Sequence, residues 1–296
     1  MIYIYSVQHI EFVHKHHFEF RYHRKKAQKP LSAFIDFFWE TDFDELYKQY
    51  PQGFSDALFP NIGYTYLINL GTPFVMQLEK DRFEIRSDAF LPRHKHMNCH
   101  HSTGNKIFGI KFKISPVLFE KKINFSEYRE YMFSLAYLID RTVVEKMKAA
   151  ASFNQRMQII SEYYEAIIKK YHGSIKQISV VSEILSDCSE SNSFDVSLQE
   201  LSNRYSVSSR TMHRYFEATT SLAGKDALQI LRIRKAVELI TQNPAAFKFS
   251  NFGYYDYSHF YKHLKQFLSH PGLPATAASL QILKSSDPGK LCLYEL

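Results

Sequence analysis

Three polar side chains able to hydrogen-bond DNA bases occur at helical spacing in the last third of the chain. Arg210, His213 and Arg214 stand at i, i+3 and i+4, so they share one face of a helix. Met212 and Phe216 fall on the other side, which is expected to be buried. A guanidinium can donate two hydrogen bonds to guanine in the major groove. The spacing favours a helix that contacts base edges, although most basic helix faces are only solvated.

The residues before this segment predict a second helix and a tight turn. Ser197-Leu-Gln-Glu200 has the spacing of a capping box, in which the serine and glutamate side chains satisfy backbone N–H groups at a helix start. Ser208 gives a second start signal a few residues further on. Two short helices joined in this way, the second with a basic face, are typical of a helix-turn-helix.

A longer helix is expected from about 225 to 242, with Arg232, Arg234 and Lys235 on its outer side, and Asn243-Pro244 ends it. Another helix begins near Asp256. Its predicted apolar stripe is Phe260, Leu264 and Phe267, and its remaining arc carries Tyr257, Ser258, Tyr261, Lys262 and Lys265. This repeats the first arrangement and predicts a second helix-turn-helix.

Residues from about 197 to 272 resemble the DNA-binding module of the AraC/XylS family of transcription regulators. The resemblance rests on an S-x-R-x-hydrophobic-x-R-x-F pattern over 208–216, R-x-x-x-A at Arg232 and Ala236, and G-Y-x-x-x-S-H-F over 253–260. That family has two helix-turn-helix units bridged by one long helix. The resemblance implies double-stranded DNA as a partner. It assigns base reading to Arg210, His213 and Arg214 in the first unit and to Tyr257, Ser258 and Lys262 in the second.

The chain departs from the family pattern in its second unit. Phe249 stands where the family has a small alanine, and Phe247 and Phe252 are also bulky. Ser221 stands where a glycine is expected after the first unit. These differences predict weaker DNA binding by the second unit, and they leave open a protein-binding adaptor that has lost its affinity for DNA.

The upstream half predicts a β-rich region. Tyr64 to Leu70 is rich in strand-forming residues, and Lys106 to Ile114 alternates with a period of two, which predicts a half-buried strand. The phrase Gly109-Ile-Lys-Phe112, followed by Pro116, resembles the cupin-like sensor domain of some family members. The resemblance implies binding of a small-molecule effector or a partner protein, or dimerisation. The expected fold class is α+β, a cupin-like barrel followed by an all-α domain.

The expected domain organisation has five parts. These are a β-rich regulatory domain at 1–115, a helical segment at 116–185, a linker at 186–195, the double helix-turn-helix at 196–272 and a disordered tail at 273–296. Within the helical segment, Met157, Ile160, Tyr164, Ile167 and Tyr171 recur at spacings of three and four. This seam can pack against its own domain or form the interface of a homodimer.

Composition and cysteine usage favour a cytoplasmic protein. The formal net charge of +7 suits a polyanionic partner. Cys99, Cys188 and Cys292 are odd in number and far apart, which argues against a disulfide framework. The N-terminus lacks the pattern of a signal peptide. The longest uncharged stretch, 63–79, is too short and polar to span a bilayer, so no membrane association is expected.

Histidines raise one alternative from a different class. His94 and His96 would project from one strand face, with His100 and His101 nearby, as metal chelation requires. The cupin metal motif expects a glutamate soon after, where this chain has Met97 and Asn98. We therefore predict no metal, no cofactor and no enzymatic activity, with a cupin-like metal-dependent enzyme as the alternative. His9, His14, His16, His17 and His23 have no fixed ligand spacing and are expected to be solvated or to face a partner.

Overall fold

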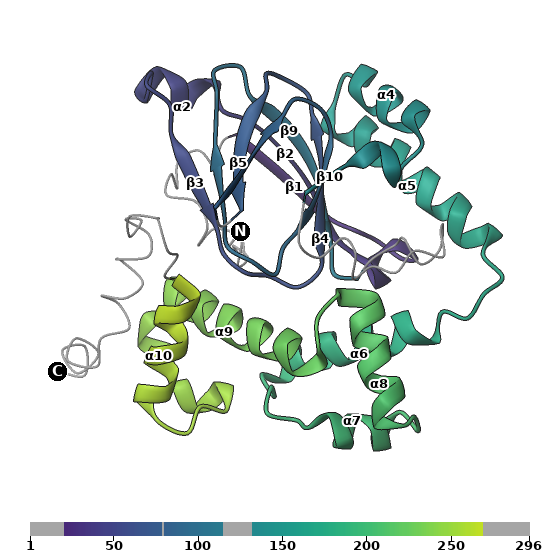
Figure 1. Cartoon of the computed structure of the whole chain (residues 1–296), viewed down its shortest axis with the longest axis vertical. Coiled ribbons are helices and arrows are strands. Elements are labelled where there is room, and N and C mark those ends of the chain that lie inside the picture. Colours follow the sequence, from purple (N-terminus) through teal and green to yellow (C-terminus); the bar gives the residue numbers. More distant parts are fainter. Residues whose placement is uncertain (1–20, 79, 115–131, 269–296) are drawn as a thin grey trace.

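The computed structural model describes residues 21–78, 80–114 and 132–268. A β-rich part, residues 21–170, is named the β domain, and an all-helical part, residues 176–268, is named the helical domain. In Figure 1 the β domain lies above the helical domain, with two helices against its side. The predicted α+β class is confirmed. The tail at 273–296, Pro116, Cys292 and the histidines at 9, 14, 16 and 17 lie outside the described residues.

Two antiparallel sheets build the β domain. The six-stranded sheet has the order β1-β2-β9-β4-β7-β10 and the four-stranded sheet β3-β8-β5-β6. The strands of the first are β1 (Tyr22–Lys26), β2 (Ile35–Asp42), β9 (Lys106–Phe112), β4 (Tyr64–Asn69), β7 (Ala89–Pro92) and β10 (Phe133–Ser134). Those of the second are β3 (Ser55–Leu58), β8 (Met97–His100), β5 (Phe74–Leu78) and β6 (Asp81–Ile85). A short helix, α2 (Asp44–Gln49), follows β2.

The central strands of the six-stranded sheet are buried on both faces. Phe37, Trp39 and Ile107 point into a core shared with the four-stranded sheet, whereas Phe108 and Ile110 belong to a second core on the helical side. Strand β9 is therefore buried almost throughout, and the prediction of a half-buried strand at 106–114 is wrong. Because both faces of the sheet are covered, the Lys111 ammonium is also buried, and it donates a hydrogen bond to the Ile62 carbonyl.

Two helices cover the outer face of the six-stranded sheet: α4 (Arg141–Ala149) and α5 (Phe153–Lys170). The short 3-10 helices η2 (Leu31–Ala33) and η4 (Leu135–Tyr137) lie beside them. Met157, Ile160 and Tyr164 are buried in the chain's own core, where the Tyr164 ring packs edge-on against Phe34 and Phe112 at 5.7 and 5.8 Å. These three residues are thus core residues and cannot form a seam with a second copy. A buried ion pair between Arg156 and Glu40, 3.0 Å, also joins α5 to β2.

The helical domain begins earlier along the chain than expected. It comprises α6 (Lys176–Ser191), α7 (Leu198–Arg204), α8 (Ser209–Thr220), α9 (Gly224–Gln242), the 3-10 helices η5 (Pro244–Ala246) and η6 (Phe249–Phe252), and α10 (Tyr257–Leu268). The expected linker at 186–195 is wrong, since α6 continues to Ser191. Cys188 and Phe194 are buried, and α6 packs against α8 and α9. None of the described helices has an apolar stretch long enough to cross a membrane.

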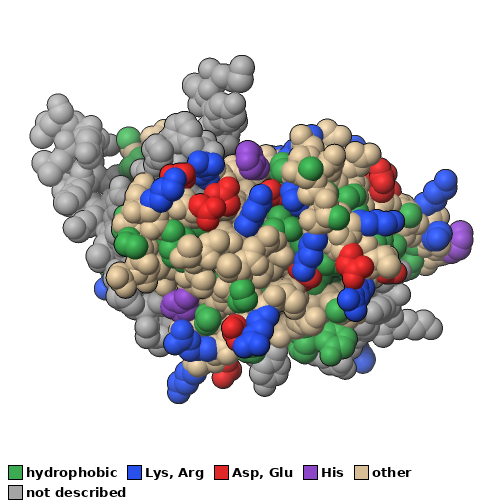
Figure 2. Space-filling view, turned by 90° about the horizontal axis from the view of Figure 1, so that it is seen from above, with side chains coloured by type: hydrophobic (Ala, Val, Ile, Leu, Met, Phe, Trp, Pro, Cys, Tyr) green, Lys and Arg blue, Asp and Glu red, His purple; other side chains and the backbone are tan. Residues whose placement is uncertain are grey.

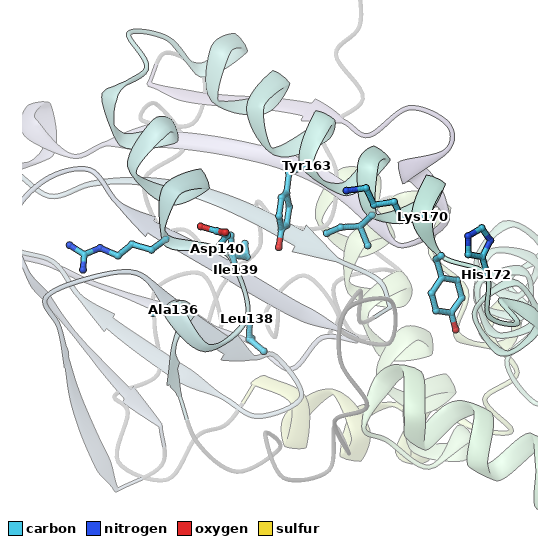
Figure 3. Close-up of a pocket in the computed structure, with 10 residues that line it drawn as sticks. Ala136, Leu138, Ile139, Asp140, Tyr163, Lys170 and His172 are labelled. Carbon is cyan, nitrogen blue, oxygen red and sulfur yellow. The ribbon is translucent and has the colours of Figure 1, made fainter.

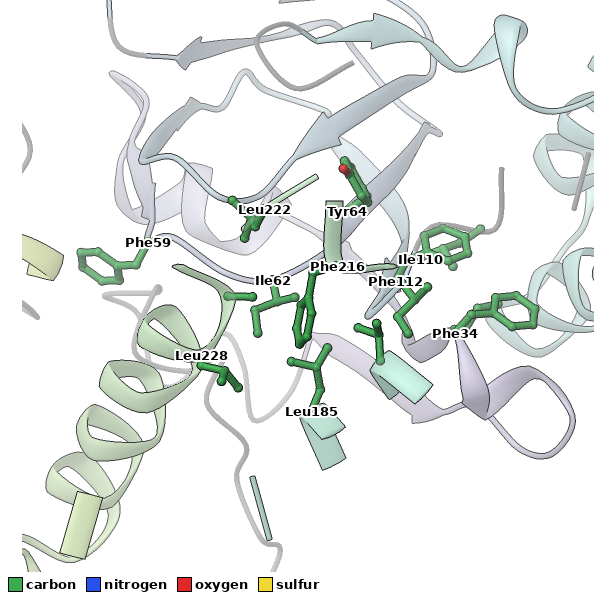
Figure 4. Close-up of a cluster of buried hydrophobic side chains, with 14 of the residues drawn as sticks. Phe34, Phe59, Ile62, Tyr64, Ile110, Phe112, Leu185, Phe216, Leu222 and Leu228 are labelled. Carbon is green, nitrogen blue, oxygen red and sulfur yellow. The ribbon is translucent and has the colours of Figure 1, made fainter. Parts of the chain in front are cut away.

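The two domains share one continuous apolar core. Figure 4 shows Ile62, Tyr64 and Phe112 of the β domain facing Phe216 and Leu228 of the helical domain. The Tyr64 hydroxyl also hydrogen-bonds the Ser221 hydroxyl at the end of α8. Because burial of apolar surface is the main stabilising term in folding, the position of α8 depends on residues of the β domain.

Candidate nucleic-acid interface

The first helix-turn-helix is built by local hydrogen bonds that the sequence predicts. The Ser197 hydroxyl accepts from the Glu200 N–H at 3.1 Å, and the Glu200 carboxylate accepts from the Ser197 N–H at 2.7 Å. The capping box is therefore confirmed. Ser206 turns the chain with φ 51°, and Ser208 caps α8 by accepting from the Thr211 N–H at 3.1 Å. Hydrogen bonding to Glu200 keeps the pKa of its carboxyl below the ordinary value.

Helix α8 separates an apolar face from a basic face. Met212 and Phe216 are fully buried, while Arg210, His213 and Arg214 are exposed. Within the described part of the chain these three side chains enter no ion pair. The predicted shared face is confirmed, and the three groups are available to an external partner. Their role in reading bases stays a prediction.

Helix α10 offers a smaller polar face. Asp256 accepts from the His259 N–H at 2.7 Å at its start, and the predicted stripe of Phe260, Leu264 and Phe267 is buried. Ser258 and Lys262 are exposed as predicted. Tyr257 is only half-buried, because its ring stacks on Tyr261 at 5.6 Å.

Two further residues near α10 were not among the predicted base readers, although Lys265 was expected on the polar arc of this helix. Tyr255 is 95% exposed in the turn before the helix, and Lys265 is exposed above the Tyr261 ring, 4.9 Å from its centroid. The spacing of Lys265 from Lys262 and Tyr261 was a usable signal. Tyr255 lies in a turn, where helical periodicity gives no information.

The second unit is a reduced helix-turn-helix. Where the first unit has α7, the second has only η6, a four-residue 3-10 helix. Pro244 and η5 occupy the residues that a longer helix would need. The bulky phenylalanines fill a local core rather than distort α10, since Phe247 packs against Phe252 and Phe260 at 5.8 and 4.9 Å. Gly253, with φ 72°, then turns the chain toward α10. The Phe-rich segment is thus accounted for by packing.

Two arginines of α9 are not on its outer side, so that prediction is wrong. Arg234 is buried and donates to the carbonyls of Pro60 at 2.8 Å and Phe59 at 3.4 Å in the β domain. Arg232 lies over the Tyr254 ring, 3.7 Å from its centroid. Arg234 therefore joins the helical domain to the β domain, and Arg232 packs inside the helical domain.

The ring of His263 completes the cluster around Arg232. Burial, Arg232 and His259 lower the pKa of His263 to about 4, so the ring is neutral near pH 7. Its Nδ1 and the Tyr254 hydroxyl form a hydrogen bond of 2.7 Å. Burial raises the pKa of Tyr254 in turn, which keeps the hydroxyl proton available for this bond.

The histidines of the β domain do not form a shared metal-binding face. His94 and His96 lie in the loop between β7 and β8, not on a strand as expected, and His96 Nε2 donates to the Phe267 carbonyl at 2.6 Å. His101 is buried between Asp56, at 3.0 Å, and Asn105, at 2.7 Å. Burial opposes protonation of His101, but Cys99 and Asp56 outweigh it and raise its pKa to about 10. Among the described residues no three such side chains converge as metal ligands would.

The end of the β domain that faces away from the helical domain carries both positively and negatively charged side chains. Figure 2 looks onto this end, and Lys and Arg side chains there alternate with Asp and Glu. Adjacent opposite charges cancel at a distance. On α10, by contrast, Lys262 and Lys265 are accompanied by no acidic residue.

Comparisons with known proteins give distant structural matches. No protein-family model and no curated protein sequence matches the chain. ToxT from Vibrio cholerae in its P21 form is 10% identical, over 85% of this chain and 96% of ToxT, with a TM-score of 0.43. ToxT from strain O395 is 12% identical over 89% and 96%, also with a TM-score of 0.43. The AraC-like transcriptional activator CuxR is 10% identical over 69% of this chain and 82% of CuxR, with a TM-score of 0.31. At these values the chain is only distantly similar to both proteins.

Proposed function

We propose that this chain is a sequence-specific DNA-binding transcription regulator of the AraC/XylS type. The observation that carries the proposal is the basic face of α8, where Arg210, His213 and Arg214 are exposed above a fully buried Met212 and Phe216. A helix held in this way by a preceding capped helix and a tight turn can lie in the major groove. Tyr257, Ser258 and Lys262 of α10 make the second, weaker contact.

The length of α9 supports the use of both units on one DNA segment. Its 19 residues span about 28 Å at a rise of about 1.5 Å per residue. One turn of B-DNA is about 34 Å. In Figure 1, α8 and α10 lie near opposite ends of α9, so the two helices are spaced for neighbouring segments of the major groove.

The β domain is proposed to sense an effector or to dimerise, and the whole protein to act in the cytoplasm without enzymatic activity. The core shared with α8 supports a sensing role, since a change in the β domain reaches the DNA-binding helices directly. The predicted homodimer needs a surface other than Met157, Ile160 and Tyr164, which are buried.

Binding-site selection with the full chain, followed by titration of single-base variants, tests this function. Arg214→Ala is expected to weaken binding by about 1–3 kcal/mol, with the loss concentrated at one base position, if the guanidinium bonds a base edge. Lys262→Ala is expected to have a smaller and less sequence-specific effect.

Arg204→Ala is the matched control, because Arg204 is an exposed arginine at the end of α7, outside the proposed reading helices. Its loss should weaken binding to all sequences alike, or not at all. If selection returns no preferred sequence, the proposed sequence-specific function is refuted. If Arg214→Ala keeps the preference while Lys262→Ala abolishes it, the assignment of the reading helix is refuted.

A further inference from the structure

An open cavity of about 580 Å³ lies on the outer side of the β domain. It is bounded by η4 and the start of α4 on one side and by the last turns of α5 on the other. Figure 3 shows Tyr163 and Lys170 extending from the same side of α5, opposite Leu138 and Ile139. The volume is within the range of about 300–1,000 Å³ that small-molecule sites occupy.

The walls of this cavity combine apolar and polar side chains. Leu138 and Ile139 form one wall, and Ile167 and the Tyr163 ring form the other. Tyr163, Ile167 and Lys170 follow one another at i, i+4 and i+7, so α5 presents them along one stripe. Leu138 and Ile139 are already buried, so an occupant with an apolar body would remove from water mainly the half-buried surface of Tyr163 and Ile167.

Among the charged groups at the rim, Lys170 is the cation that no described carboxylate pairs with. Arg141 pairs with Glu145 at 2.8 Å. Asp140 caps α4 by accepting from the Thr142 N–H at 2.8 Å, and this hydrogen bonding lowers the pKa of its carboxyl. Lys170 forms no ion pair with any described residue, and its ammonium points toward Tyr163 in Figure 3. His172 is exposed at the same end.

Lys170 also has an ordinary structural role. It lies with Lys169 in the last turn of α5, where cations stabilise the partial negative charge of a helix C-terminus. Only Lys170 lines the cavity. The two neighbouring lysines therefore share the helix-end effect and differ in their access to the cavity.

We propose that this cavity binds an organic anion with an apolar body, such as an aryl or alkyl acid, with its charged group at Lys170. The cavity also reaches Tyr171 and His172, the first residues of the connection from α5 to α6. A bound anion would therefore contact the segment that joins the β domain to the helical domain. This inference rests on the sensing role proposed above for the β domain and names its ligand class, but it does not depend on DNA binding.

Fluorescence titration of the full chain with two dyes tests the proposal. Anilinonaphthalene sulfonate carries an anion on an apolar body, and phenylnaphthylamine is its uncharged counterpart. Lys170→Ala is expected to weaken sulfonate binding by about two- to fivefold, the effect of one partly exposed ion pair, and to leave binding of the neutral dye unchanged. Ile167→Ala should weaken binding of both dyes.

Lys169→Ala serves as the matched control and should leave both affinities unchanged. The proposal is overturned if Lys170→Ala does not weaken sulfonate binding, if Lys169→Ala weakens it equally, or if the neutral dye loses as much affinity as the anionic one. Circular dichroism of each variant confirms that it is folded, which is expected because both lysines are exposed. DNA is absent from this experiment, so its result is separate from that of the binding-site selection.

Discussion

Replacing Arg234 with methionine should loosen the helical domain from the β domain. Arg234 is 3% exposed and reaches from the middle of α9 to the backbone of the β domain. Methionine keeps most of the apolar stem but loses the guanidinium, whose carbon lies 6.0 Å from the centroid of the Phe267 ring. The substitution therefore removes the charged hydrogen bonds and leaves much of the packing in place.

The expected cost follows from the two carbonyl contacts. The bond to the Pro60 oxygen is 2.8 Å and is assisted by the charge of the guanidinium, whereas the bond to the Phe59 oxygen is long at 3.4 Å. A hydrogen bond from a charged donor contributes about 1.5–3 kcal/mol, and an unsatisfied buried carbonyl costs a similar amount. Because these terms overlap, we expect a loss of about 2–3 kcal/mol in the free energy that couples the domains.

Trp39 allows this coupling to be measured. It is the single tryptophan of the chain and lies in the core between the two sheets, so its fluorescence reports on the β domain. Far-UV circular dichroism is dominated by helices, most of which lie in the helical domain. In urea the two signals should change together in the unmodified protein, since the domains share a core. In Arg234→Met the helical signal should change at lower urea than the Trp39 signal.

Lys235→Met provides the control, because Lys235 is partly exposed and pairs with Glu238 on its own helix. In Lys235→Met the Trp39 fluorescence and the far-UV circular dichroism should still change at the same urea concentration. Coincident transitions in Arg234→Met, with a midpoint shift no larger than that of Lys235→Met, would refute the assigned role of Arg234. Separate transitions in the unmodified protein would refute the shared core as the source of coupling.

Two further outcomes are expected from buried groups. The pKa of His263 is about 4 in the folded protein and about 6.5 in the unfolded chain, so only the unfolded chain binds the proton between these values. Stability should fall as pH decreases through this window, and urea midpoints should fall less in His263→Gln; equal slopes would contradict the role of His263. Gly109→Ala should destabilise the β domain by about 3 kcal/mol or more, because a Cβ there would overlap the Trp39 ring. Urea unfolding followed by Trp39 fluorescence measures this loss, and one below about 1 kcal/mol would contradict the packing.

The first helix-turn-helix could be predicted in detail because its determinants are local. The capping box joins residues three apart, and the faces of α8 follow from a spacing of three and four. Hydrogen bonds and helical periodicity of this kind lie within about ten residues of each other. The same reasoning found the buried stripe of α10.

The first half of the second helix-turn-helix and the end of α6 could not be predicted in this way. Residues 186–191 are mostly small and polar, which is typical of a linker, yet Cys188 faces the core and extends α6. Such burial depends on α8 and α9, which are distant in the sequence. The short η6 likewise replaces an expected helix because Pro244 and Phe247 fix the preceding residues by packing.

Residues between two packed layers were the hardest to place. Arg234 and Lys111 are charged and each falls in an element with an apparent polar side. A period of two or of 3.6 identifies a polar face, which is normally assigned to solvent. In this chain the polar face of each element meets a second layer, so the charge is buried and satisfied by a carbonyl. The same double coverage turns part of the α5 seam into core.

The contact between the β domain and the ends of α8 and α10 has a thermodynamic consequence. Tyr64 bonds Ser221, and His96 bonds the Phe267 carbonyl, so a rearrangement of either domain changes the contacts of the other. If a bound molecule changes the affinity for DNA by some factor, DNA must change the affinity for that molecule by the same factor. For the DNA binding and sensing proposed above, a short DNA duplex can therefore serve as a reagent that reveals which small molecules the β domain distinguishes.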